Sequence, residues 1–419
     1  MPNKQVLKND IRLITAPLQE TQTASILVLT RVGSRYESRE TGGISHFIEH
    51  MLFKGTDKRP DTLALAKALD GVGAEFNAFT SKDITAYYVK ADFRHLSLAI
   101  DVLSDMLLHS KFDEGEIEKE KGVIVEEINM YEDNPIMYVE DLLEQTMFGD
   151  NELGRTISGS RENVRSLNRD KMLEYRDQFY NGKNTVIAVA GRFADSHLKE
   201  IEEKFVLPAG EGKNQFTKLS FEQKEPRLTV KDKETEQVQV ALGFPAYAYG
   251  DPRVYILQLL SVILGGNMSS RLFLEVREKN GLAYFIRSSV GMYEDIGTFV
   301  IQAGLDKNRI DDAIKLIMLE LKKIKDGIVE EELQRAKDYL AGKLAIDLED
   351  SAELSQWYGQ QELMCEKMLT PGEKIKIIMA INRDEIINIA RDVLDFNRVS
   401  LAVIGPFKEA EERFKKLLV

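Results

Sequence analysis

The chain has very little cysteine, few histidines and no long apolar run. Its 419 residues include a single cysteine, so no internal disulfide framework can form, and a reducing compartment is favoured. The longest nearly apolar run, residues 254–264, is interrupted by Gln258 and Ser261 and is too short to cross a bilayer. The N-terminal residues also lack the apolar segment of a signal peptide. These absences predict a soluble, cytoplasmic protein with no membrane partner.

Acidic residues outnumber basic residues in this chain. The net charge is −13, spread along the chain rather than gathered in a tail. A negative surface opposes nucleic acid binding, whereas acidic residues that line a cavity would favour cationic substrates. Hydrophobic residues make up 43% of the chain, which is enough for large cores. The composition therefore predicts a globular protein of about two to four domains without a nucleic-acid partner.

The two halves of the sequence resemble one another. Residues 184–193 (NTVIAVAGRF) recur as residues 397–407 (NRVSLAVIGPF), and each stretch has a buried-strand pattern that leads into a charged helix. The strand patterns at residues 25–32 and 237–244 also correspond. Similarity at so long a period indicates duplicated domains rather than a solenoid.

The duplication predicts the fold class. We expect an α+β protein with two homologous domains, each a mixed or antiparallel sheet covered by helices. The domains are predicted at residues 1–207 and 226–419, with a polar, glycine-containing linker at residues 208–225. In the first domain, residues 76–80 and 85–91 predict a hairpin around a polar turn.

The most specific local signal is His46-Phe47-Ile48-Glu49-His50. On a helix, two histidines four residues apart lie on one face and can bind the same metal ion. Glu49 falls on that face too, close enough to bond a water at the metal without being a ligand itself. Apolar residues at positions 44, 47, 48, 51 and 52 form a core-facing stripe on the other side. This H-x-x-E-H spacing is the inverzincin motif and predicts a hydrolytic zinc centre.

Two simpler interpretations compete with this one. The histidines could be surface residues on an amphipathic helix, or they could belong to a purely structural zinc site. Structural zinc sites favour cysteine, and Cys365 lies far away in sequence. His95, His109 and His197 are predicted to be surface or partly buried residues. Residues 257–261, which correspond to the motif in the second half, are apolar, so only the first half can hold this metal site.

A third ligand is expected on the helix predicted after Glu116, where three carboxylates compete. At about 100° per residue, Glu127 and Glu120 share the inward face within about 20°, whereas Glu126 points towards the polar side. We therefore assign Glu127 as the ligand. Glu120, two turns earlier, is expected to orient a ligating histidine or its water.

With these motifs in view, the sequence resembles the pitrilysin-type inverzincins, the family of insulin-degrading enzyme and the mitochondrial processing peptidase. The resemblance covers essentially the whole chain in a set of ordered motifs: GSRYE at 33–37, MLFKGT at 51–56, NAFT at 77–80, VEEI at 125–128, GGNMSSRL at 265–272 and VREKNGLAY at 276–284. The length is similar to that of the short, two-domain subunit form, in which two subunits pair as the halves of a clamshell.

The resemblance implies a zinc endopeptidase with one Zn²⁺ per chain. Its implied ligands are His46, His50 and Glu127, and Glu49 is the implied general base. The substrates would be peptides that can become extended, enclosed in a chamber that excludes folded proteins.

The resemblance also implies residues that bind the substrate. Asn77 and Ala78, followed by Phe79, match an edge strand whose backbone binds the substrate as an added β-strand. Arg277 and Tyr284 match a pair from the non-metal domain that contacts the substrate and helps to stabilise the tetrahedral intermediate.

The metal residues and the Arg277–Tyr284 pair fall in different halves, and this predicts a homodimer whose active site is completed by the second subunit. The alternative is a catalytically silent or partner-dependent subunit of a processing-peptidase-like heterodimer. Such relatives lose ligands, or they divide the metal motif and the Arg/Tyr pair between two chains. This chain carries both sets, which favours the homodimer.

Overall fold

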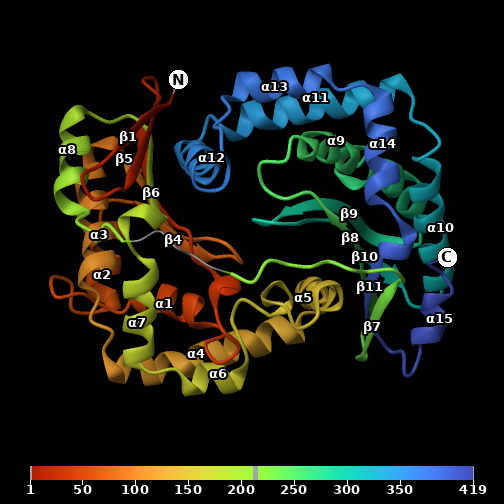
Figure 1. Ribbon diagram of the computed structural model, residues 1–419, viewed down its shortest axis with the longest axis horizontal. Helices are drawn as coiled ribbons and strands as arrows, with labels where there is room; N and C mark the ends of the chain where they lie inside the picture. The colour runs from red at the N-terminus through yellow and green to blue at the C-terminus, as the bar shows by residue number, and fades with distance from the viewer. Residues whose placement is uncertain (1, 211–215, 419) are drawn as a thin grey trace. The chain divides into compact units, whose positions relative to one another are not determined.

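The computed structural model describes residues 2–210 and 216–418 as two units, each with its own sheet (Figure 1). The first unit lies within Met1–Asn129, Arg155–Thr217 and Ala345–Thr370, and the second within Met130–Gly154, Lys218–Leu344 and Pro371–Val419. Residues 211–215 of the predicted linker lie outside the described residues. Both units combine a mixed sheet with helices, so the α+β fold class is confirmed.

The first sheet has the strand order β1-β2-β6-β3-β5-β4. Its strands are β1 (Asn3–Val6), β2 (Arg12–Pro17), β3 (Thr23–Thr30), β4 (Glu75–Thr80), β5 (Thr85–Asp92) and β6 (Thr185–Gly191). The β2–β6 pair is parallel and the other pairs are antiparallel. Strands β4 and β5 form the predicted hairpin, and β4 is an edge of the sheet.

The second sheet has the order β7-β11-β8-β10-β9, which matches the order of the first sheet from β2 to β4. Its strands are β7 (Arg227–Asp232), β8 (Gln237–Ala246), β9 (Ala283–Met292), β10 (Gly297–Asp306) and β11 (Ser400–Gly405). Again one pair, β7–β11, is parallel, and β8 lies between β11 and β10 as β3 lies between β6 and β5. The matching order supports the duplication inferred from the sequence.

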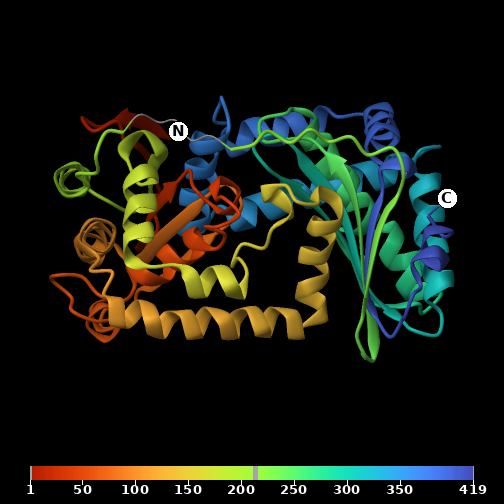
Figure 2. The same cartoon turned by 60° about the horizontal axis from the view of Figure 1, so that its bottom comes forward.

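Helices cover both sheets. Those of the first unit are α1 (Ile44–Leu52), α2 (Thr62–Asp70), α3 (Leu96–His109), α4 (Glu114–Asp133), α6 (Arg161–Ser166), α7 (Arg169–Phe179), α8 (Asp195–Lys204) and α12 (Ser351–Met364). Those of the second are α5 (Pro135–Phe148), α9 (Arg253–Gly265), α10 (Ile310–Lys323), α11 (Glu330–Asp347), α13 (Pro371–Ala380), α14 (Arg383–Val393) and α15 (Glu411–Lys415). Figure 2 shows α4 as a long helix that leads directly into α5. Within the described residues, no helix is long and apolar enough to span a membrane.

Each half of the chain contributes one helix to the other half's sheet. Helix α12 packs against β3 and β6, and Gly359 allows a close approach because a Cβ there would lie 2.5 Å from Leu29. Helix α5 packs against β11 and β8, where a Cβ at Gly243 would lie 2.5 Å from Met147. The two units are therefore not contiguous in sequence, since packing between distant segments decides which sheet these helices cover.

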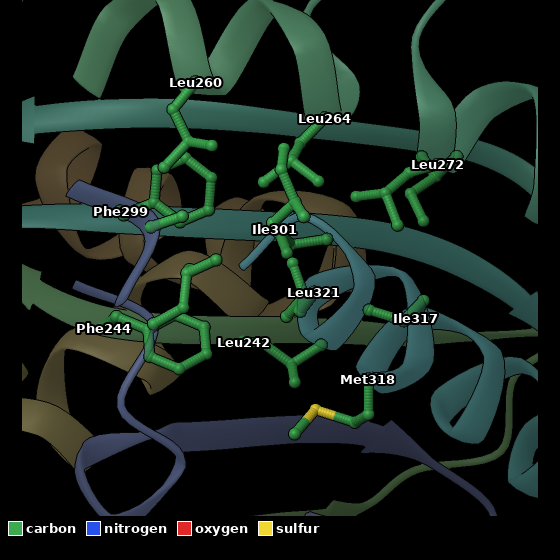
Figure 3. Close-up of a cluster of buried hydrophobic side chains, with 14 of the residues drawn as sticks. Leu242, Phe244, Leu260, Leu264, Leu272, Phe299, Ile301, Ile317, Met318 and Leu321 are labelled. Atoms are coloured by element: carbon green, nitrogen blue, oxygen red, sulfur yellow. The ribbon is translucent and has the colours of Figure 1, made fainter. Parts of the chain in front are cut away.

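The core of the second unit forms between its sheet and its helices. Figure 3 shows Phe244 and Phe299 from the strands facing Leu260 of α9 and Leu321 of α10, and all four are fully buried. In the first unit, the apolar side of α1 enters the equivalent core with Phe47, which is also fully buried. This packing fixes α1 against the sheet and leaves its opposite side for the polar residues of the motif.

Candidate metal centre and active site

Helix α1 begins at a buried turn that positions its first residues. Gly43 has φ of 93° and a Cβ there would lie 2.5 Å from the Ser158 carbonyl oxygen, so only glycine fits. The Glu37 carboxylate accepts hydrogen bonds from the backbone N–H groups of Gly43 (2.6 Å) and Ser45 (2.8 Å). Burial raises the pKa of Glu37 to about 7, although these hydrogen bonds act in the opposite direction. The start of α1 is thus held by a buried side chain from outside the helix.

The structure brings the side chains of all three predicted metal ligands together. The Nε2 atoms of His46 and His50 are 3.2 Å apart, and Glu127 Oε2 of α4 lies 3.7 Å from the first and 3.5 Å from the second. All three ligand atoms fall within 4.8 Å of one another. Glu126 is exposed, so Glu127 rather than its neighbour reaches the histidines. The ligand role itself stays a prediction.

The chemistry of this donor set fits zinc. Two imidazole nitrogens and one carboxylate are the ligands of many catalytic zinc sites, which leave a fourth position for water. Burial, followed by the proximity of His50, lowers the pKa of His46 to about 3, so this ring is neutral and its lone pair is available. The residues present are therefore suited to a zinc ion.

Glu120 lies behind His50 and is almost fully buried at 3% exposure. One of its oxygens is 2.8 Å from His50 Nδ1, and the other is 2.6 Å from Lys54 Nζ. Burial raises the pKa of Glu120, but the hydrogen bonds from His50 and Lys54 outweigh this effect and leave the pKa below its usual value. This geometry is compatible with the predicted role of Glu120 in orienting His50, and the role stays a prediction. Lys54 was not foreseen from the sequence, although it follows His50 by one helical turn.

Glu49 is partly buried beside the two histidines. Its Oε2 accepts a hydrogen bond of 2.5 Å from the hydroxyl of Thr80, the last residue of β4. Burial raises the pKa of Glu49 above its ordinary value, against the effects of the Thr80 bond and of His50. Sequence reasoning missed Thr80. The signal available was its place at the end of the NAFT motif, next to the hairpin turn.

The residues predicted to bind substrate lie on β4. Asn77, Ala78 and Phe79 are consecutive on this edge strand, and the strand packs against α1. Among the described residues β4 pairs with β5 alone, so its other side offers backbone groups for an added strand. The side chain of Asn77 accepts a hydrogen bond of 2.9 Å from the Ala78 N–H.

Arg277 and Tyr284 belong to the second unit. Arg277 lies in a π-helical segment, η5 (Phe273–Lys279), and its guanidinium stacks 4.7 Å from the centre of the Phe273 ring. Tyr284 is 58% exposed near the start of β9, the edge strand of the second sheet. Both side chains are accessible, and their contribution to the site in the first unit stays a prediction.

Comparison with known proteins assigns the chain to a family. Residues 12–161 match the insulinase family (peptidase family M16), and residues 166–340 match the peptidase M16 inactive domain. An uncharacterized zinc protease of Bacillus subtilis (strain 168) is 38% identical over 97% of this chain and 98% of its own length. Another, from Streptomyces coelicolor, is 36% identical over 97% of this chain and 90% of its own. A protease structure from Helicobacter pylori shares the fold, with a TM-score of 0.89, 21% identity and coverage of 97% of this chain and 99% of that one. The chain therefore belongs to the insulinase family, peptidase family M16.

Proposed function

We propose that this protein is a zinc endopeptidase that hydrolyses extended peptides bound along β4. The observation that carries the proposal is the convergence of His46, His50 and Glu127 within 4.8 Å, with Glu49 between the two histidines on α1. Membership of the M16 family and the zinc-protease names of the relatives support it. These names describe proteins that are themselves uncharacterized, so the activity requires a direct test.

One zinc ion per chain would be held by His46, His50 and Glu127. When bound, zinc supplies a Lewis acid that acidifies water and polarises a carbonyl group. Glu49 is not one of the three converging groups, so its carboxylate stays available as a base.

Glu49 would accept a proton from the attacking water and later deliver it to the leaving amine. The hydrogen bond from Thr80 occupies Oε2 and leaves Oε1 available to receive the proton. Since Glu49 is partly buried and its pKa is raised, it binds a proton more readily than an exposed carboxylate does. These properties suit a group that must both accept and release a proton.

Substrate would be bound through its backbone on the open edge of β4. Strand addition recognises main-chain groups more than side chains, so specificity should be loose and limited to segments that can become extended. We further propose that two chains pair and enclose the substrate, with Arg277 and Tyr284 of one chain completing the site of the other. Both residues are accessible in the second unit, which is the condition that such a contact requires.

The test compares the wild-type protein with Glu49→Gln and, as a matched control, Glu126→Gln. Zinc content is measured per chain, and hydrolysis of a mixed peptide library is followed by mass spectrometry. Glu49→Gln should keep its zinc and lose about 10²–10⁴-fold in activity, the range for a general acid–base group. Glu126→Gln, at an exposed position on α4, should change neither quantity. An inactive wild-type protein with a full complement of zinc would overturn the proposal.

A further inference from the structure

A buried carboxylate connects one histidine of the proposed metal centre to a lysine. The two oxygens of Glu120 are divided between His50 Nδ1 (2.8 Å) and Lys54 Nζ (2.6 Å). Glu120 is 3% exposed, so water cannot replace either contact easily. The lysine side chain is 23% exposed and joins this buried carboxylate to the surface.

The connection is made by α4, which carries Glu120, and by the residue two positions after the end of α1, Lys54. Lys54 follows His50 by four residues, and its backbone N–H bonds to the Met51 carbonyl and continues the last turn of α1. Glu120 precedes Glu127 on α4 by two turns. The Lys54–Glu120 ion pair therefore links the segment that directly follows α1 to α4, on the helix pair whose ligand atoms must converge.

The two histidines differ in how they are supported. The Nδ1 atom of His50 is fixed by Glu120, whereas the buried Nδ1 of His46 has no hydrogen-bond partner among residues 2–210 and 216–418. Of the two Nδ1 atoms, that of His50 is therefore the one held by a hydrogen bond within the described part of the chain. A carboxylate on Nδ1 holds the imidazole in one tautomer and one rotation, which leaves Nε2 free to bind a metal.

We propose that Lys54 is a positioning residue for the metal centre and acts through Glu120 on His50. Its ammonium group occupies the second oxygen of Glu120 and so keeps the first oxygen directed at His50 Nδ1. Without Lys54, a buried oxygen would lose its partner, and the carboxylate would turn to recover one, which would release the His50 ring. The inference rests on the proposed zinc site but not on the identity of the substrate.

The competing explanation is that Lys54 only holds α1 and α4 together. Removal of Lys54 would then lower the melting temperature but leave the metal affinity of the folded protein unchanged. Metal affinity is therefore the decisive measurement, and it does not depend on peptidase activity. Losing a partner of this kind to a ligating histidine weakens metal binding by about 10–100-fold.

The experiment uses Lys54→Met, Lys54→Arg and the control Lys119→Met in the full chain. Lys119 also pairs with a carboxylate of α4, Glu116, but its side chain is 72% exposed and lies away from the ligands. Zinc affinity is measured by competition with a chromophoric chelator, and the cobalt-substituted proteins are compared by visible absorption. Lys54→Met should bind zinc about 10–100-fold more weakly and change the cobalt spectrum. Lys54→Arg should restore most of the affinity, and Lys119→Met should match the wild type.

A double-mutant comparison sharpens the test. In a Glu120→Gln background, Lys54→Met should have little further effect on zinc affinity, because both changes break the same connection. If Lys54→Met fails to fold, Lys54→Gln takes its place in the same measurements. Wild-type zinc affinity and an unchanged cobalt spectrum in folded Lys54→Met, or in the Lys54→Gln that replaces it, would overturn the inference. A wild-type protein that binds zinc without cleaving peptides would instead overturn the proposed function and leave this inference standing.

Discussion

The two units repeat one sheet order, yet they differ at the helix that follows the matching strands β3 and β8. Helix α1 buries one side and presents His46, Glu49 and His50 on the other. Helix α9 is apolar almost throughout, with Leu257 and Leu260 fully buried. A duplicated framework therefore does not by itself make a site. The chemistry comes from a few polar positions on α1, from the facing carboxylates of α4 and from the end of β4.

The starts of these two helices differ as well. Helix α1 begins where the Glu37 carboxylate accepts two backbone N–H groups. At the start of α9, Pro252 makes no side-chain capping bond, but the Asp251 carboxylate accepts a hydrogen bond of 2.9 Å from the N–H of Arg253, the first residue of the helix. The start of α1 thus receives two hydrogen bonds from one buried carboxylate, whereas α9 receives one from Asp251 and packs against β9 and α14.

The largest effect should come from removing the carboxylate that α4 contributes to the proposed metal site. Glu127→Gln should lose zinc and activity, because only this α4 side chain reaches both histidines. Glu126→Gln should behave like the wild type because Glu126 is exposed. Metal content after dialysis against a mild chelator distinguishes the two. Loss of zinc from the Glu126 variant would show that the helix face has been assigned one residue out of register.

The next largest effect should come from changes that separate the metal residues of the first unit from Arg277 and Tyr284 of the second. A Glu49→Gln chain and an Arg277→Ala/Tyr284→Phe chain should each be inactive alone. If the sites are completed in trans, random exchange gives heterodimers with one intact site, so mixing should restore about a quarter of the wild-type activity. Light scattering should first show a mass of twice 47.6 kDa. Demonstrated subunit exchange with no recovery of activity would rule out completion in trans.

A smaller effect is expected at the contact between β4 and the general base. Thr80→Val removes the hydroxyl that bonds Glu49 Oε2 at 2.5 Å and keeps the β-branched shape of the side chain. Activity should fall by about 10–150-fold through kcat, since one hydrogen bond to a charged group contributes about 1.5–3 kcal/mol. Zinc content and KM should stay unchanged. The control is Thr21→Val, which also removes a threonine hydroxyl that accepts a hydrogen bond but lies away from the site. Thr85→Val is unsuitable because Thr85 is fully buried and its hydroxyl donates a hydrogen bond to the Val32 carbonyl.

Local patterns in the sequence were enough to predict much of the fold and part of the candidate site. The duplication, the β4–β5 hairpin and the two sides of α1 follow from periodicity, which acts over short distances. The choice of Glu127 over Glu126 followed from helical geometry alone. The exchange of α5 and α12 could not be predicted this way, because it depends on packing between segments distant in sequence.

The supporting residues of the site escaped sequence analysis for a related reason. Lys54, Thr80 and Glu37 each act on a group from another segment, respectively Glu120, Glu49 and the start of α1. Each lies in one of the ordered motifs of the sequence, but a motif does not state which partner a side chain meets. Only the packed structure joins the two sides of such a contact.

Replacing Glu37 should have the smallest effect on activity, but it should change how the stability of the protein depends on pH. Burial raises its pKa from 4.5 to about 7 in the folded protein, so the folded state binds this proton more tightly than the unfolded state does. The contribution of Glu37 to stability is therefore fully present below about pH 4.5 and is lost as the pH rises through about 7. Over this window the difference amounts to about 3 kcal/mol.

Glu37→Gln should remove that pH dependence, because an amide does not titrate in this range, and it should weaken the hydrogen bonding at the start of α1. The melting temperature of the wild type should therefore exceed that of the variant most near pH 5. This difference in melting temperature should be smaller at pH 8. Zinc content should change little because Glu37 bonds only the backbone of Gly43 and Ser45. Glu40→Gln is the matched control, since Glu40 is exposed near the same turn. A wild-type advantage that grew from pH 5 to pH 8 would mean that Glu37 holds α1 as an anion whose pKa is lowered, and the assignment of its protonation would be reversed.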